Sequence, residues 1–130
     1  MTDEKNAGAK AAGDIQAEED LPEETKQVVS ELRGRHKKIA VFYDEDFGLV
    51  VVAKQKGASA EANYQRFVNE LQDPEVDKAL AMKTYALACT VYPARDQAKR
   101  IFEDNPAFAL KVAGRAQKLA GSGVKELGKA

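Results

Sequence analysis

Hydrophobic residues recur at helical spacing through the middle of the chain, between Val76 and Pro93. They form two stripes of the same period: Val76, Leu80, Leu87 and Val91, and beside them Met82, Tyr85, Cys89 and Tyr92. A helix that is apolar on more than one face is normally surrounded by neighbouring elements. Proline disfavours helical geometry in the residue before it, so Pro93 is predicted to end the helix. The pattern therefore predicts a central core helix.

A second pattern, typical of β-strands, occupies two runs separated by a short acidic turn. The runs are residues 38–43 and 47–54. Their spacing predicts a hairpin. In the second run Leu49 and Val51 lie on one face and Val50 and Val52 on the other, so both faces are apolar. Because a lone hairpin is only marginally stable, we expect it to pack on helices, with its second face or free edge recruiting another copy of the chain.

Local signals place four more helices around these elements. They are Leu21–Arg33, a helix from Ser59 to the break at Asp73 and Pro74, Arg95–Asp104 and Pro106–Ala120. Gly34 is the predicted stop of the first helix, and Ser59 is the predicted N-cap of the next. Pro74 is expected at the first position of the central helix, and Gly121 at the end of the last. The fold class is therefore α+β, mainly α: an N-terminal helix, one β-hairpin and a bundle of four helices.

Length and charge indicate one domain with a tail at each end. The chain has 130 residues and a net charge of −1. Residues 1–20 contain six acidic residues and two lysines, a net −4, which leaves +3 for residues 21–130. Residues 1–20 are predicted to be a disordered acidic tail, either merely solvated or an interaction tail. Residues 21–121 form the predicted single domain, and residues 122–130 a flexible C-terminal segment.

Few residues are available for catalysis or metal binding. The single Cys89 excludes an internal disulfide and any cysteine-based metal site, and on an apolar helix it is predicted to fill the core. The single His36 has no orienting partner in its basic surroundings. We therefore predict no catalytic, metal or cofactor residues and no enzymatic activity. No apolar run reaches the length of a membrane helix and no secretory signal is visible, so a cytoplasmic location is expected.

Two basic features are candidates for binding. Arg33, Arg35, Lys37 and Lys38 precede the hairpin, and Lys111, Arg115 and Lys118 recur along one face of the last helix. Each group is either an ordinary solvated face or a docking face for an acidic partner. Nucleic acid is the weaker alternative, because aromatic residues are not interleaved with the basic ones.

Four short motifs follow one another within residues 21–121: Arg66-Phe67, Cys89, Tyr92-Pro93 and Leu119-Ala120-Gly121. Their order and spacing resemble those of the tail assembly chaperones of long-tailed bacteriophages. Those proteins typically have a charged helix, a short β segment, an RF-containing helix, a helix ending in C.VYP and a final helix ending in LAG.

The resemblance implies a non-enzymatic protein of the bacterial host cytoplasm that is absent from the mature virion. Such chaperones bind and solubilise the tape-measure protein and help to recruit tail-tube subunits. They are often made also as a longer form by −1 frameshifting, and Leu127-Gly128-Lys129 is compatible with a slippery codon sequence. The alternatives are another phage structural protein, such as a head–tail connector or tail completion factor, and a small nucleic-acid-binding regulator.

A chaperone needs apolar surface for its client and charge for its own solubility. The predicted contact residues are the second hairpin face, the exposed side of the helix containing Tyr64 and Leu71, and the basic stripe of the last helix. They comprise Val50, Val52, Arg66, Lys111, Arg115 and Lys118. For each apolar residue among them, burial in the core is the competing interpretation.

Overall fold

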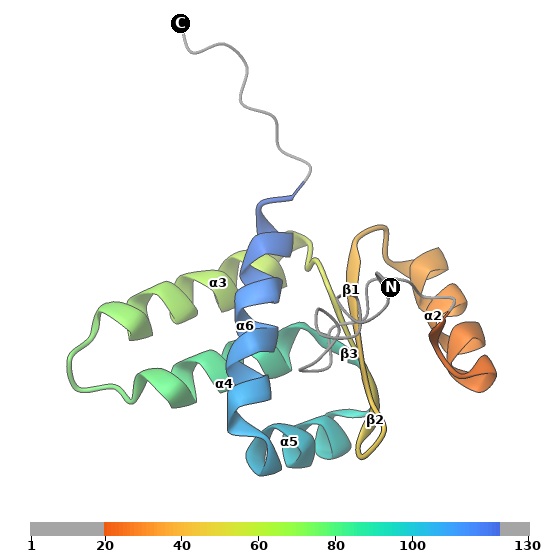
Figure 1. The fold of residues 1–130 in the computed structure, drawn as a ribbon. Helices are drawn as coiled ribbons and strands as arrows, with labels where there is room; N and C mark the ends of the chain where they lie inside the picture. Colours follow the sequence, from red (N-terminus) through yellow and green to blue (C-terminus); the bar gives the residue numbers. More distant parts are fainter. Residues whose placement is uncertain (1–19, 123–130) are drawn as a thin grey trace, which may run out of the picture.

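A computed structural model describes residues 20–122 and shows a mainly helical α+β domain, as the sequence predicts (Figure 1). The elements are α2 (Glu23–Arg35), β1 (Ile39–Asp44), β2 (Gly48–Ala53), α3 (Gly57–Gln72), α4 (Lys78–Cys89), β3 (Thr90–Tyr92), α5 (Arg95–Asp104) and α6 (Pro106–Ala120). The predicted order of helix, hairpin and four helices is confirmed in part, because a third strand interrupts the helical series. The predicted tails lie outside the described residues, apart from Asp20 and Ser122.

The sheet is antiparallel, with β2 in its centre and β1 and β3 at its edges. β1 pairs with β2 in the register Val41↔Val51. β3 pairs with the other edge of β2, with Val52 opposite Thr90. The prediction that the central helix continues to Pro93 is therefore wrong: α4 ends at Cys89, since the next three residues join the sheet instead.

Helices cover both faces of the sheet. On one face, Val41, Leu49 and Val51 pack with α2 through Val29 and Leu32. On the other face, a larger core joins the sheet to α3, α4, α5 and α6; it includes Phe42, Val50, Val52, Phe67, Tyr85, Phe102 and Val112. Figure 1 shows α2 on one side of the strands and the other helices on the opposite side. The chain thus supplies the cover for the second hairpin face that the sequence assigned to a partner.

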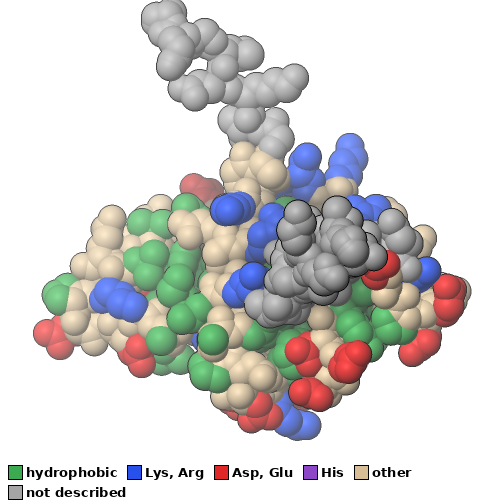
Figure 2. Space-filling view, in the orientation of Figure 1, with side chains coloured by type: hydrophobic (Ala, Val, Ile, Leu, Met, Phe, Trp, Pro, Cys, Tyr) green, Lys and Arg blue, Asp and Glu red, His purple; other side chains and the backbone are tan. Residues whose placement is uncertain are grey.

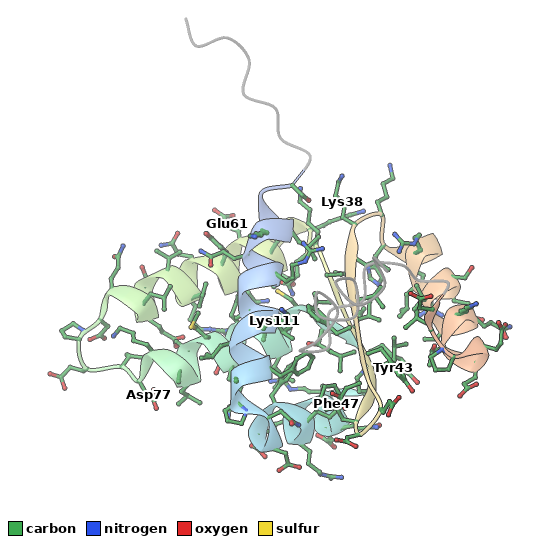
Figure 3. All side chains as sticks on the ribbon, viewed as in Figure 1. Lys38, Tyr43, Phe47, Glu61, Asp77 and Lys111 are labelled. Carbon is green, nitrogen blue, oxygen red and sulfur yellow. The ribbon has the colours of Figure 1, made fainter. Side chains whose placement is uncertain are left out.

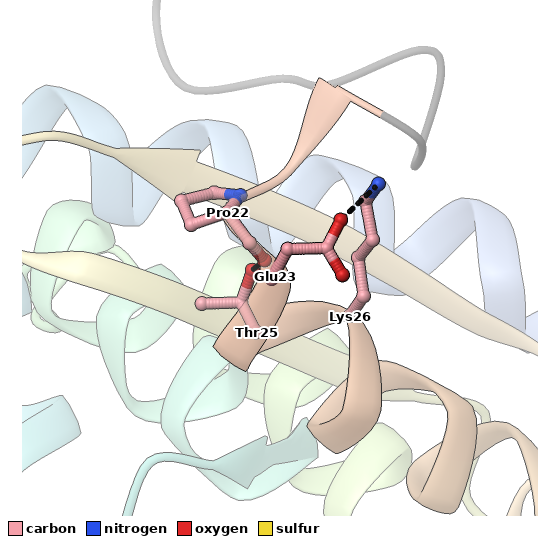
Figure 4. A network of polar contacts seen from close by, with 4 residues as sticks. All are labelled: Pro22, Glu23, Thr25 and Lys26. Atoms are coloured by element: carbon pink, nitrogen blue, oxygen red, sulfur yellow. Dashed lines mark hydrogen bonds and ion pairs between the residues drawn. The ribbon is translucent and has the colours of Figure 1, made fainter.

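Helix α2 begins through contacts among its own first residues (Figure 4). The Thr25 hydroxyl donates to the Pro22 carbonyl at 2.6 Å, and Lys26 Nζ lies 3.2 Å from Glu23 Oε2. The helix continues past Gly34, the predicted stop, and ends when His36 adopts an extended backbone and donates its N–H to Leu32 O. Glu23 in the first turn and Arg35 in the last complement the helix dipole.

The predicted boundaries of the other helices are right for two of them and wrong for two. The predicted ranges of α5 and α6 agree with the structure, including Gly121 as the C-cap of α6. The predicted caps of the two preceding helices are wrong. α3 begins at Gly57, ahead of Ser59, and the N-cap of α4 is Asp77, whose carboxylate accepts from the N–H groups of Ala79 and Leu80. Between residues 20 and 122, no helix combines the length and apolar character needed to cross a bilayer.

Candidate functional site

A hollow in the helical layer lies where α3, α4 and α6 meet, and we call it the α3–α4–α6 groove. Its volume is about 380 Å³. Its lining combines small residues with two tyrosines: Ala53, Gln55, Ala60, Glu61, Tyr64, Tyr85, Cys89, Ala116, Gln117, Ala120 and Gly121. The small residues let the three helices approach closely and leave a mainly apolar surface between them. Glu61 at the rim points outward from α3 in Figure 3.

One wall of this groove is an aromatic cluster that connects α3 to α4. The rings of Phe67 and Tyr85 are stacked with centroids 4.4 Å apart. Tyr64 meets both rings edge-on, at 6.2 Å from Phe67 and 5.8 Å from Tyr85. Gln117 of α6 lies 3.5 Å from the Tyr64 hydroxyl and extends the wall to the third helix. Tyr64 and Tyr85 line the groove and the buried Phe67 packs against both, so this side of the groove is rigid.

Cys89 lines the groove but is a poor nucleophile. The residue is buried, and burial raises the pKa of its thiol to about 11, although a hydrogen bond with the Tyr85 side chain acts in the opposite direction. Burial, together with the neighbouring Cys89, also raises the pKa of the Tyr85 hydroxyl. Both groups are therefore neutral near pH 7, and a neutral thiol is neither a good nucleophile nor a good metal ligand. This pair fits an apolar binding wall better than a reactive centre.

A second hollow, the Leu80–Leu110 groove, lies between the beginnings of α4 and α6. It has a volume of about 220 Å³, and its lining combines apolar residues such as Phe102, Pro106 and Ala109 with the charged Asp77, Lys83 and Glu103. Leu80 is 52% exposed and Leu110 39% exposed. Exposed leucines on both sides of a hollow are candidates for contact with a partner.

The exposed face of α6 lies beside this apolar region and carries positive charge. Gly114 lies on it, and a methyl group added there would meet no atom within 4 Å. Beside it, Lys111 and Arg115 are half-buried and Lys118 is exposed, so the basic stripe of the sequence lies on one helical face. Figure 2 shows Lys and Arg side chains along α6, with hydrophobic side chains over α3 and α4 beside it. Lys111 is at mid-helix in Figure 3.

Of the other predicted contact residues, one lies on the surface and two lie in the core. Arg66 is exposed on α3, where a partner could reach it. Val50 and Val52 are 0% exposed, so the interpretation of these two valines as contacts for a partner is wrong. Their side chains pack against the helices of the main core, with Phe42 and Val112. The sequence showed that both hairpin faces were apolar but did not show that α2 and the bundle would cover them.

The basic cluster before the hairpin is divided by the structure. Arg35 and His36 line a depression together with Lys54 and Lys56, which come from the connection between β2 and α3. Sequence spacing gave no reason to group Arg35 and His36 with Lys54 and Lys56, because about twenty residues separate the two pairs. The acidic turn of the hairpin is explained by its own backbone: Asp44 Oδ1 accepts from Asp46 N at 2.7 Å. Within residues 20–122, no group of three His, Cys, Asp or Glu side chains is placed to hold a metal ion.

A family model matches most of the helical layer. Residues 55–127 match the model of a family described as a domain of unknown function, DUF6848. This range is more than half of the chain. The protein belongs to the DUF6848 family. No curated protein and no solved structure matches the chain significantly.

The matched range begins just after β2 and includes α3, α4, β3, α5 and α6. It therefore contains both grooves described above, apart from Ala53, whereas α2 and the hairpin lie outside it. The family is thus defined by the helical layer that carries the candidate site.

Proposed function

We propose that this protein is a tail assembly chaperone of a long-tailed bacteriophage, which binds a helical segment of the tape-measure protein and keeps it soluble. The observation that carries the proposal is the uncovered apolar surface beside α6. Leu80 and Leu110 are exposed on either side of a groove, and the cationic stripe of α6 lies next to them. A binding role without catalysis is the role that such a surface supports best.

The positions of the resemblance motifs in the fold support this proposal. Phe67 and Leu119 are buried in the main core, and Cys89 is buried at the floor of the α3–α4–α6 groove. Residues far apart in sequence thus meet in one region, as expected if the motif order reflects a common packing arrangement. Their work is to build the surface, and the exposed residues around them contact the client.

An amphipathic helix is the client that matches this surface. Its apolar stripe would cover Leu80 and Leu110, and its acidic residues would face Lys111, Arg115 and Lys118. Gly114 permits close approach of a second helix, since no side chain occupies the space above it. Burying the exposed part of each leucine contributes only about 1 kcal/mol, so one copy binds weakly, and tight binding along a long client requires that the bound copies also contact one another.

Co-expression with the tape-measure protein that the proposal assigns as its client tests the proposal. The wild-type chain is expected to keep that protein in the soluble fraction and to co-purify with it. The double variant Leu80→Ser/Leu110→Ser should lose both effects while retaining its circular dichroism spectrum. Tyr92→Ser is the matched control, because Tyr92 is also a large exposed side chain, at 37%, but lies on β3 outside both grooves. Failure of the wild-type chain to solubilise or bind the client would overturn the proposal.

Mass spectrometry of purified virions separates a chaperone from a structural component. A chaperone is absent from finished particles, whereas a head–tail connector or tail completion factor remains in them. Retention on immobilised DNA or RNA, decreasing steeply with salt concentration, would instead indicate a nucleic-acid-binding regulator.

A further inference from the structure

A depression at the beginning of α3 is lined by positive charge from two separate parts of the chain. Its volume is about 390 Å³. Arg35 and His36 reach it from the end of α2, and Lys54 and Lys56 from the connection between β2 and α3. None of the described residues that line it is Asp or Glu. We call this depression the basic cleft.

The local backbone adds to this charge. Helix α3 begins at the cleft, receives no side-chain N-cap and has no acidic residue in its first turn. The N–H groups at a helix start carry partial positive charge, which acids in the first turn would otherwise offset. The Ser59 side chain in this turn also lines the cleft and provides a neutral hydrogen-bond donor.

Two hydrogen bonds anchor residues that line the cleft. Lys54 Nζ donates to the carbonyl of Ser122 at 2.7 Å, and Gln55 Nε2 donates to the carbonyl of Ala88 at 2.8 Å. These bonds connect the end of β2 to the ends of α6 and α4. A site with fixed walls and exposed cations such as Arg35 and Lys56 favours an anionic ligand, since little order is lost on binding.

The chain itself contains an acidic segment that can reach the cleft. Residues 1–19 contain five acidic residues and two lysines, a net charge of −3, and lie outside the described structure. The segment joins α2 at its beginning, whereas the cleft lies at the end of α2, about 20 Å away for a helix of 13 residues. Nineteen residues can span up to about 60 Å, so the acidic side chains can reach the cleft without strain.

We propose that the acidic N-terminal segment, residues 1–19, binds in the basic cleft of its own chain. Charge complementarity and reach support this occupant. The cleft shares Ala53, Gln55 and Cys89 with the α3–α4–α6 groove, so a bound segment lies beside that groove. The segment would then compete with acidic groups of any partner for the cations of the cleft, whatever the identity of that partner.

Paramagnetic broadening in the full-length protein tests the proposal. A nitroxide is attached to an Ala9→Cys variant, in which the buried Cys89 is protected from labelling. At low salt the amide signals of residues 56–59 are expected to lose intensity, whereas those of the middle of α5 keep theirs. The loss should disappear in about 0.5 M NaCl, where charges are screened within about 4 Å.

Charge reversal provides the control. Arg35→Glu/Lys56→Glu should abolish the broadening, and Lys99→Glu/Arg100→Glu, an equal change of charge on the exposed face of α5, should preserve it. Circular dichroism checks that both variants fold. Absence of broadening at residues 56–59, or broadening that survives Arg35→Glu/Lys56→Glu in the folded protein, would overturn the proposal. Equal broadening from a labelled chain onto a second, isotopically labelled chain would overturn the assignment to the same chain.

Discussion

The rings of Phe67 and Tyr85 lie nearly parallel, with 7° between their planes and 4.4 Å between their centroids. Phe67 comes from α3 and Tyr85 from α4, and Phe67 is the only fully buried side chain of the sixteen-residue α3. Helix α3 is therefore attached to the domain through this stacked pair, together with the partly buried Tyr64 and Leu71 that pack against the main core. Since α3 forms one side of the α3–α4–α6 groove, the same contact also maintains the groove.

Replacing Phe67 should be the most damaging single change in α3. Phe67→Ala is expected to lower the free energy of unfolding by about 3–5 kcal/mol, because it removes a fully buried ring and leaves a cavity against Tyr85. The neighbouring exposed Arg66→Ala should change it by less than about 0.5 kcal/mol. Urea denaturation of both variants measures the difference. Similar values for the two would show that α3 is held by other contacts.

The N-cap of α4 provides a second test on the same side of the domain. Asp77 Oδ1 accepts from Ala79 N at 3.0 Å and from Leu80 N at 3.4 Å. Asp77→Ala should reduce the free energy of unfolding by about 0.5–2 kcal/mol, because two backbone donors lose their partner. Asp77→Asn retains an acceptor and should recover most of the loss. If the Asn variant were as unstable as the Ala variant, the carboxylate charge rather than the hydrogen bonds would account for the cap.

The parts of the fold that sequence could predict are those with local signals. Pro106 at the start of α6 and Gly121 at its end fix the bounds of that helix without reference to the rest of the molecule. Strand β3 has no such signal. Thr90, Val91 and Tyr92 continue the apolar period of α4, and they become a strand because the edge of β2 is available to pair with them.

The candidate site was less predictable for the same reason. Periodicity places Leu80 among core residues, but only the arrangement of α4, α5 and α6 leaves it 52% exposed. Conversely, Val50 and Val52 satisfied the pattern of an open apolar face and are buried. The apolar stripe of α2, with Val29 and Leu32, was the signal that the chain could cover a hairpin face itself. Sequence could identify apolar faces, whereas exposure depends on which neighbours cover them.

Gly114 is expected to reduce the stability of the folded chain. Glycine within a helix costs about 0.5–1 kcal/mol relative to alanine, and the space around Gly114 is open. Gly114→Ala should therefore raise the free energy of unfolding by about that amount. Gly48→Ala is the contrasting variant, because Gly48 has a φ of 90° and alanine is strained there. A loss of stability in Gly114→Ala would contradict the open geometry, and a gain accompanied by weaker client binding would favour close helix approach at this position.

The buried thiol predicts a loss of stability in alkaline solution. In the folded chain burial raises the pKa of Cys89 from 9.0 to about 11, whereas in the unfolded chain the thiol is solvated. Between these two values the thiol of the unfolded state loses its proton first. The contribution of Cys89 to the free energy of unfolding is therefore fully present below pH 9 and decreases as pH rises towards 11. A shift of this size corresponds to about 2–3 kcal/mol. The raised pKa of Tyr85 extends the decrease to higher pH.

Urea denaturation at several pH values should show a shallower decrease for Cys89→Ala than for the wild-type chain, whatever the stability of the two proteins at neutral pH. Parallel curves for the two proteins would mean that the thiol titrates normally and that the floor of the groove is open to water.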